Sequence, residues 1–489
     1  MAEQTQQIEQ TPQGQQTPTE PGAPHKSSTD RLGSASIAKL LVEFSIPSIV
    51  AMLCNSLYNI VDTIFLQIAV PNVGAAVTQL AWPVQCILLG LSMLAGIGGN
   101  ALAAIELGRG NKEKVERILA NTATLLVALG VLSAIVGTLL IDPLLTILGT
   151  TDELWTPTKT FVQIICVGFV LQSLGNGMNN FLRTAGQPNL ALGFSFLGTV
   201  ACAVLNALFV LVLGWGIAGS AYATILGQAI GMIPTVGYFI FSKKTPFRLH
   251  VRMLPIQGKL ALSIMSLGLA SFVMQVGSSV VTVVLNNVIN LYAAADPIGP
   301  TAALATISIV WKVLGICYTM IIGITAGAQP ILGYNVGAQN WGRVLEALKL
   351  ACFGSVGLAF VCWLAFEIIP QIVLVPFSVQ SDLMDFACMT MRIFAIWLPF
   401  VGYQMMGSSY FQSSGQPVKS TILELTRQII FLIPLYLLFP PVAMALFNVS
   451  GLTGVLLCVP ISDVLAFVTT TIFVVLEVRK LRRLRAGQA

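Results

Sequence analysis

Twelve apolar stretches, each long enough to cross a lipid bilayer, follow one another along this chain. A membrane-spanning helix needs about 20 mostly apolar residues, and irregular backbone exposed to lipid is excluded because its polar groups would lack hydrogen-bond partners. Only 9% of the residues are charged, against about 25% in an average soluble protein. The sequence therefore predicts an all-α, polytopic membrane protein. The expected spans are 38–66, 76–105, 120–141, 160–183, 189–213, 217–241, 260–290, 302–328, 346–366, 384–412, 419–439 and 452–476.

The basic residues indicate which way the helices cross the membrane. Twelve spans place both chain ends on one side, and Lys and Arg prefer cytoplasmic loops. The loops on the side of the termini and the segment after the last span carry Arg109, Lys112, Lys114, Lys243, Lys244, Arg248, Arg252, Arg479, Lys480, Arg482, Arg483 and Arg485. The opposite loops carry Asp142, Asp152, Glu153, Asp296 and Asp382. We therefore expect a multi-pass protein of the cell (inner or plasma) membrane, with both termini in the cytoplasm.

A repeat relates the two parts of the chain. The loop residues 108–111 correspond to 337–340, and the Gly-Gln-Pro sequence at 186–188 recurs at 415–417, with the same offset in both cases. Six helices in each half imply halves related by an axis along the membrane normal, with the substrate cavity expected between them. We divide the chain into a disordered cytoplasmic tail (1–33), an N-terminal six-helix bundle (34–250), a C-terminal six-helix bundle (251–478) and a basic cytoplasmic tail (479–489).

Asp62 is the outstanding ionisable residue within the expected spans. Charged side chains inside a bilayer are costly, so they usually mark ion or substrate pathways. Asn55 and Asn59 precede Asp62 on the same helical face. No Lys or Arg is near in sequence, so a proton or a sodium ion could neutralise the carboxylate. The alternative role for Asp62 is hydrogen bonding between helices.

Further ion-coupling candidates lie in the fifth, sixth and twelfth spans. Asn206 and Thr224 supply neutral oxygen atoms, whereas Asp463 lacks an obvious local partner and is the second candidate for coupling. Glu424 and Arg427 stand at adjacent-turn spacing in the eleventh span, and we expect them to pair with each other.

Polar side chains at helical spacing form candidate cavity faces, which either bind a solute or join neighbouring helices. Lys312 and Arg392 either face the central cavity or extend toward its edge, and we expect the second. The fourth span ends with polar residues that either line the cytoplasmic mouth or anchor the loop: Asn176, Asn179, Asn180 and Arg183. The candidate cavity residues are Asn55, Asn179, Asn180, Gln275, Ser279, Asn286, Gln404 and Gln412.

Several classes of protein are excluded by what the sequence lacks. Its two histidines, His25 and His250, fall outside the expected spans, so neither a Ser-His pair nor a His-based metal site is expected inside the membrane. There is no P-loop for ATP and no Cys-x-x-Cys spacing among the nine cysteines. We therefore expect no enzyme and no cofactor, and the energy for transport would come from a proton or sodium gradient.

Seven stretches in both halves carry a resemblance to a known family. They are YNIVDTIF (58–65), NNFLRTAGQP (179–188), LGWGIAGSAYAT (213–224), QPILGYNVGAQN (329–340), YFQSSGQP (410–417), RQIIFLIP (427–434) and PISD (460–463). In this order they resemble the multidrug and toxic compound extrusion (MATE) family, within it the MepA-type branch.

The resemblance implies a V-shaped pair of six-helix bundles that exports cationic, amphipathic drugs and other toxic compounds in exchange for protons or sodium ions. Such an antiporter would confer antibiotic resistance. Asp62 matches the family's helix 1 carboxylate, a sodium site if sodium is the coupling ion, and Pro47 matches the proline about which that helix bends. Many relatives have an acidic residue where this chain has Asn206, an asparagine where it has Cys202, and a glycine where it has Gln67. The resemblance therefore leaves proton and sodium coupling both open.

Two other functions remain as alternatives. A lipid or lipid-linked sugar flippase of the same superfamily would more often have fourteen helices and a markedly cationic cavity. A membrane-embedded sensor or scaffold would need an extramembrane domain, which the short loops do not provide. The expected partners are small organic cations and the lipid bilayer, with no nucleic acid and no obligate protein partner.

Overall fold

The structure is a computed structural model that describes residues 30–70, 73–147, 150, 152–243, 245–377 and 381–487. The predicted N-terminal tail falls almost entirely outside these ranges. So do the side chains of residues 57–63, which include Asn59 and Asp62. Within the described ranges every regular element is a helix, which confirms the all-α fold predicted from the sequence.

The helices follow the predicted order. The first half of the chain contains α1 (Asp30–Ser34), α2 (Ile37–Ala69), α3 (Val73–Gly108), α4 (Lys112–Leu139), α5 (Ile141–Ile147), α6 (Asp152–Thr184), α7 (Pro188–Asn206), the π-helical turn η1 (Ala207–Val212) and α8 (Gly216–Phe241). After the 3-10 turn η2 (Val251–Met253), the second half contains α9 (Gly258–Ala293), α10 (Pro300–Gly337), α11 (Trp341–Ile368), α12 (Pro370–Leu374), the 3-10 turns η3 (Val375–Phe377) and η4 (Ser381–Leu383), α13 (Met384–Ala395), α14 (Leu398–Ser413), α15 (Pro417–Leu425), the π-helical turn η5 (Thr426–Leu432), α16 (Ile433–Phe447) and α17 (Gly451–Ala486).

Eleven of the membrane-length segments are unbroken by a sharp bend, counted over the described ranges, and η4–α13 with α14 supplies a twelfth across a bend of 44°. Pro399 stands at the beginning of α14, where its ring nitrogen cannot donate the hydrogen bond that would continue α13. The predicted number of spans is therefore confirmed, but the segment 384–412 is a bent pair of helices.

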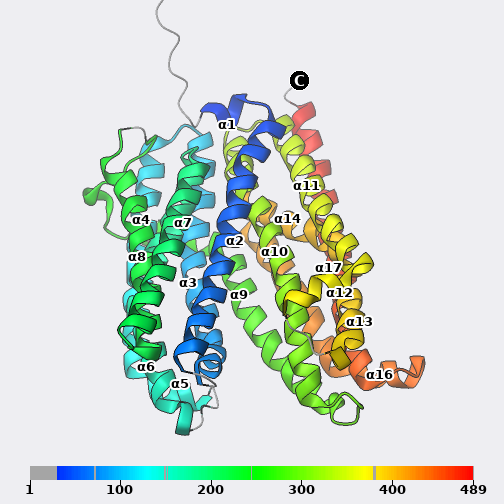
Figure 1. The fold of residues 1–489 in the computed structure, drawn as a ribbon. Helices are drawn as coiled ribbons and strands as arrows, with labels where there is room; N and C mark the ends of the chain where they lie inside the picture. The colour runs from blue at the N-terminus through cyan, green and yellow to red at the C-terminus, as the bar shows by residue number, and fades with distance from the viewer. Residues whose placement is uncertain are drawn as a thin grey trace, which may run out of the picture.

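Figure 1 shows two groups of helices that meet at one end of the molecule and diverge toward the other. The end where they meet carries α1 and the C terminus, and we call it the terminus-side end. The opposite end, where α5 and α16 lie, is called the far end. The helices therefore splay apart as the resemblance implied.

The loops that defined the repeat have the same backbone conformation in both halves. Gly110 and Gln339, which the repeat offset pairs, have positive φ angles of 78° and 56°. Gly186 and Gly415, the pair after α6 and α14, have φ angles of 76° and 77°. Each loop also repeats its partner's backbone hydrogen bonds at the same offset. Positions paired by this offset are therefore structurally equivalent, and we call them matched positions.

Glycines hold the two groups of helices together at the terminus-side end. Gly108 of α3 lies so close to the carbonyl of Tyr334 in α10 that a Cβ atom would overlap it. Gly337 of α10 stands in the same relation to the carbonyl of Ile105 in α3. Gly108 and Gly337 are matched positions, so the contact is reciprocal.

A second pair of matched glycines extends this contact. Gly98 of α3 meets the backbone of α9 at Ile264, and Gly327 of α10 meets the backbone of α2 at Phe44 and Ser45. Small residues permit this close approach of helix backbones, which strengthens packing within a membrane. We call Gly98, Gly108, Gly327 and Gly337 the glycine seam.

The beginning of the chain's first long helix is built into the second half. Leu32, Ile37 and Phe44 share a buried apolar cluster with Ile331 of α10 and Val344 of α11. The terminus-side end of α2 therefore bridges the two groups of helices.

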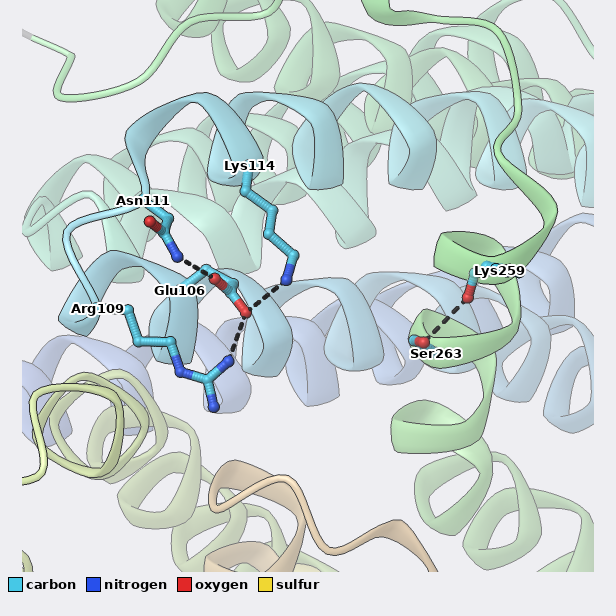
Figure 2. Close-up of polar contacts among 6 residues, drawn as sticks. All are labelled: Glu106, Arg109, Asn111, Lys114, Lys259 and Ser263. Carbon is cyan, nitrogen blue, oxygen red and sulfur yellow. Dashed lines mark hydrogen bonds and ion pairs between the residues drawn. The ribbon is translucent and has the colours of Figure 1, made fainter.

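The two halves stabilise their terminus-side loops through different polar side chains at one pair of matched positions. Glu106 is buried and its carboxylate accepts hydrogen bonds from Arg109 (2.8 Å), Asn111 (2.9 Å) and Lys114 (2.9 Å), as Figure 2 shows. This cluster closes the α3–α4 loop on itself.

The corresponding position in the second half is Asn335. Its Oδ1 accepts a hydrogen bond from Nε of Arg343 (3.0 Å), and its Nδ2 donates to the carbonyl of Leu32 (3.1 Å). Arg343 also donates to the carbonyl of Ala35 (2.6 Å). The hydrogen bonds of Asn335 and Arg343 thus hold the segment before α2 against the second half of the chain.

Candidate substrate cavity and charged network

A cavity of about 400 Å³ lies between the two halves. Its wall contains residues of α2, α3, α6, α7 and α8 from the first half, and of α9, α10, α14 and α15 from the second. Apolar side chains such as Trp82, Phe161 and Met274 alternate with amides and hydroxyls. This mixture is typical of sites for amphipathic small molecules, in which a few polar groups set orientation.

The first half supplies amides and one guanidinium to the cavity. Asn55, Asn179, Asn180 and Thr224, which were predicted as site residues, line it together with Arg183. Asn179 also donates to the carbonyl of Ala191 (3.0 Å), at the beginning of α7. The two roles considered for the end of the fourth span, cavity lining and loop anchoring, are thus combined at Asn179.

Arg183 is 3% exposed and occupies the last turn of α6. One terminal nitrogen donates to Oδ1 of Asn180 (2.7 Å), whereas the buried Nε atom has no hydrogen-bond partner among the described residues. None of the ion pairs found within the described ranges includes Arg183. Arg183 is therefore a buried cation whose counter-charge is not supplied by those residues.

The second half carries a fully hydrogen-bonded amide at the matched position. This residue, Gln412, donates from Nε2 to the carbonyl of Leu267 (2.8 Å) and to Oγ of Ser271 (3.0 Å). Its Oε1 accepts a hydrogen bond from Gln329 (3.1 Å). Gln412 and Gln275, both predicted as cavity residues, line the cavity.

Glu424 is the acidic group among the described lining residues. It stands seven positions after the start of α15, as Ser195 stands seven positions after the start of α7, and both line the cavity. Arg183 and Glu424 are the two charged residues in that described lining. The basic group of the described lining therefore comes from the first half, and its acidic group comes from the second.

A buried ion pair lies behind this wall. Arg427, in the π-helical turn η5, donates from Nε to Oδ1 of Asp463 in α17 (3.2 Å). The guanidinium also lies over the ring of Tyr318, with its carbon 5.4 Å from the ring centroid. Ser462 donates to the backbone carbonyl of Arg427 (3.0 Å).

This pair corrects one prediction. The hydrogen-bonded partner of Arg427 in the described part of the chain is Asp463 rather than Glu424. Asp463, which has no obvious partner nearby in sequence, is paired with a residue of another helical element. A π-helical turn contains more residues than an α-helical turn, so spacing along the sequence no longer predicts which side chains share a face.

Several other predicted residues lie away from the described cavity wall. Asn206 is buried and donates to the carbonyl of Cys202 (3.2 Å), while Ser279 and Gln404 are buried and Asn286 is half-buried. Asn59 and Asp62 lie in α2, but their side chains are outside the described residues. Pro47 is also inside α2.

The basic residues of the eighth and tenth spans do not reach the described lining. Lys312 is exposed, and Arg392 is half exposed with Nε 3.7 Å from Oε2 of Glu367. The described cavity wall therefore includes neither side chain, and extension toward the edge stays a prediction.

Sequence reasoning treated Glu424 as half of an ion pair and therefore did not propose it for the cavity. The constant offset between the halves could have indicated it, because Glu424 and Ser195 each follow a repeated Gly-Gln-Pro sequence by seven positions. Trp82 and Gln85 were missed because one sequence does not reveal which face of α3 is turned inward.

Comparisons with known proteins agree with this architecture. A family model described as MatE matches residues 47–208 and 276–438, one match in each half. The chain is 24% identical over 444 residues to the multidrug export protein MepA of Staphylococcus aureus (strain MSSA476), which covers 90% of this chain and 94% of that protein. It is 20% identical over 447 residues to an FAD transporter of Shewanella oneidensis, across 89% of this chain and 94% of that protein.

Solved structures show the same fold. An outward-facing conformation of a multidrug resistance MATE family transporter of the MOP superfamily matches with a TM-score of 0.84 at 22% identity, over 92% of this chain and 98% of that one. A MOP superfamily transporter from Pyrococcus furiosus, described as having a binding pocket of reversed polarity, matches with a TM-score of 0.83 at 22% identity, over 92% and 98%.

Proposed function

Because the chain belongs to the MatE family of transporters, and is thus a transporter and not an enzyme, we propose that it exports cationic amphipathic compounds in exchange for protons or sodium ions. The observation that carries the proposal is the mixed polar and apolar cavity between the two halves. A site shared by two repeats is the arrangement from which alternating access arises, since rocking one half against the other exposes the same site to either side.

The contacts between the halves support this mechanism. They meet backbone to backbone along the glycine seam at the terminus-side end and diverge toward the far end. In the proposed cycle the seam separates when the cavity opens to the terminus side. We propose that this side faces the cytoplasm, which the positive-inside rule supports, and that the protein lies in the cell membrane.

The bundles defined as 34–250 and 251–478 are the proposed moving units. The bridge from the beginning of α2 to α10 and α11 must then bend or slide during the cycle. Pro47 lies within the stretch of α2 that packs against α10 and lacks a backbone donor, so we propose it as the point of bending.

We propose Asp62 as the coupling carboxylate, with Asn59, Asn206 and Thr224 supplying neutral ligands or hydrogen bonds. Bound substrate and bound ion would favour different states, so each promotes release of the other. Asp463 is the second coupling candidate, and its pairing with Arg427 supports a role in which the ion pair breaks and re-forms.

The charge of the cavity argues against the flippase alternative. Its described lining contains one basic and one acidic residue, whereas binding of a phosphate-bearing lipid would favour several cations. The sensor or scaffold alternative predicts no movement of solute across the membrane at all.

Efflux of ethidium from proteoliposomes tests the proposal. Wild-type protein should accelerate efflux under an imposed proton gradient or an imposed sodium gradient, and Asp62→Asn should respond to neither. Asp142 is an exposed carboxylate of α5, so Asp142→Asn is the matched control and should behave as wild type. Equal efflux by wild type and Asp62→Asn would exclude Asp62 as the coupling residue, and no efflux by wild type would contradict export.

A further inference from the structure

Arg183 presents an electrostatic problem that the described part of the protein does not solve. A guanidinium stays protonated at any physiological pH, and a buried charge without a counter-ion is strongly unfavourable. Among the described residues, its side chain makes one hydrogen bond, to a neutral amide, and its Nε atom has no partner. An anion is therefore the missing component of this site.

The loop after α6 does not require this charge. The backbone nitrogen of Gly186 donates to the carbonyl of Arg183 (3.0 Å), and at the matched positions Gly415 donates to the carbonyl of Gln412 (3.3 Å). The same turn therefore forms in the second half, where the side chain at the matched position, Gln412, is neutral. Anchoring of the loop does not explain why position 183 carries a guanidinium.

Position within the cavity indicates what the guanidinium binds. Arg183 lines the same cavity as Glu424, which comes from the opposite half. A solute with one group of each sign satisfies both residues at once, and its apolar body would contact the aromatic and aliphatic wall. Arg suits a carboxylate because its planar fork matches two carboxylate oxygens.

We propose that Arg183 binds the carboxylate of transported solutes while Glu424 faces their cationic group, so that the substrates of this cavity include amphipathic zwitterions. This inference rests on the transport function proposed above and names its substrate class. Removing the Arg183 charge should then affect carboxylate-bearing solutes far more than plain cations.

Two dyes that differ only at the carboxyl group provide the test. Rhodamine 110 carries a free carboxylate, and rhodamine 123 is its methyl ester. In proteoliposomes with the full chain, wild type should transport both. Arg183→Gln should lower rhodamine 110 transport about tenfold or more, the loss expected for one charge-assisted hydrogen bond. Rhodamine 123 transport should be retained or increased, because the variant lacks a guanidinium that repels cations.

Glutamine is the suitable replacement because the second half already uses it at the matched position, and Arg183→Lys should retain part of the rhodamine 110 transport. If Arg183→Gln cannot be purified, the affinities of the wild-type protein for the two dyes are measured in detergent by fluorescence anisotropy. Rhodamine 110 should then bind at least as tightly as rhodamine 123, and weaker binding of the acid would overturn the inference.

The outcomes separate this inference from the proposed function. Transport of neither dye by wild type would overturn both. Transport of rhodamine 123 alone, or an equal loss of both dyes in Arg183→Gln, would overturn the carboxylate site and leave export standing. Acetate or inorganic phosphate that displaces rhodamine 110 at micromolar concentration would identify a small-anion site and also overturn the proposal.

Discussion

Matched positions in the two halves are of two kinds. At 108 and 337 both halves keep glycine, and each glycine packs against the backbone of the other half. At 183 and 412 one half has a guanidinium and the other an amide, while at 195 and 424 one has a hydroxyl and the other a carboxylate. The matched glycines hold the halves together, whereas the matched positions that differ within the cavity supply its basic and its acidic group.

The largest expected effect comes from disturbing the shared positions. Gly337→Ala places a methyl group against the carbonyl of Ile105, and such overpacking costs about 1–3 kcal/mol. We expect ethidium efflux from proteoliposomes to fall about tenfold to hundredfold, because the terminus-side end no longer closes.

Gly357→Ala is the matched control, since a Cβ atom at this position in α11 meets nothing within 4 Å. It should leave efflux unchanged. The seam is reciprocal, so Gly108→Ala should reproduce the defect of Gly337→Ala. A defect in only one of the two would mean that the contact is not shared equally.

The next effect concerns the buried ion pair between η5 and α17 in the second half. Asp463→Asn leaves Arg427 charged and mostly buried, which should lower the free energy of unfolding by about 3 kcal/mol. Thermal unfolding in detergent measures this loss. The double variant Arg427→Gln/Asp463→Asn should recover much of it, because no buried charge remains; a double variant less stable than the single one would show that the pair is not the cause.

Charges exchanged between the halves should change cation selectivity. Gln412→Arg adds a second guanidinium to the cavity, so the KM for ethidium transport should rise about tenfold through repulsion. Ser195→Glu adds a carboxylate at the position matched to Glu424 and should lower that KM. An unchanged KM in both variants would mean that these positions do not sense the substrate.

The smallest effect is expected at the terminus-side loop. Glu106→Gln removes the charge that binds Arg109 and Lys114, whose side chains are about half exposed, so solvent screening should limit the loss of stability to about 1 kcal/mol. Glu113→Gln, in an exposed pair with Arg117, serves as control and should have no measurable effect. If Glu113→Gln lowered the free energy of unfolding more than Glu106→Gln does, burial of the carboxylate would not be the reason for the effect.

The fold was largely predictable because its causes are local in sequence. Lengths of apolar sequence set the spans, and the constant offset between the two Gly-Gln-Pro loops indicated the repeat, which the matched φ angles of Gly186 and Gly415 confirm. Pro399 lies inside a predicted span, where a proline permits a bend, and the structure has a bend of 44° there. The sequence alone did not show how large the bend is, because a proline kinks or ends a helix depending on its neighbours.

The site was predictable only in part. Helical spacing correctly gave Gln275 and Gln412 an inward face, but it could not show that the described cavity wall excludes Ser279. The partner of Arg427 was predicted wrongly because α-helical spacing was assumed where the chain forms a π-helical turn, and because the contact with α17 joins residues far apart in sequence. The comparison of the two halves is what identified Arg183, since only its counterpart Gln412 shows that the charge is dispensable for the loop.

The distance between the two halves at the terminus-side end is the most direct test of whether they rock about the glycine seam. Spin labels replace Glu113 in α4 and Lys480 in α17, two exposed positions at the terminus-side end, in a variant whose nine cysteines have been replaced and whose ethidium efflux is retained. Pulsed electron–electron double resonance should show two distances between the labels. Ethidium should increase the population of one distance, and the coupling ion should increase the population of the other. A single distance that neither ligand changes, in a protein that still transports, would contradict rocking of the halves about the glycine seam.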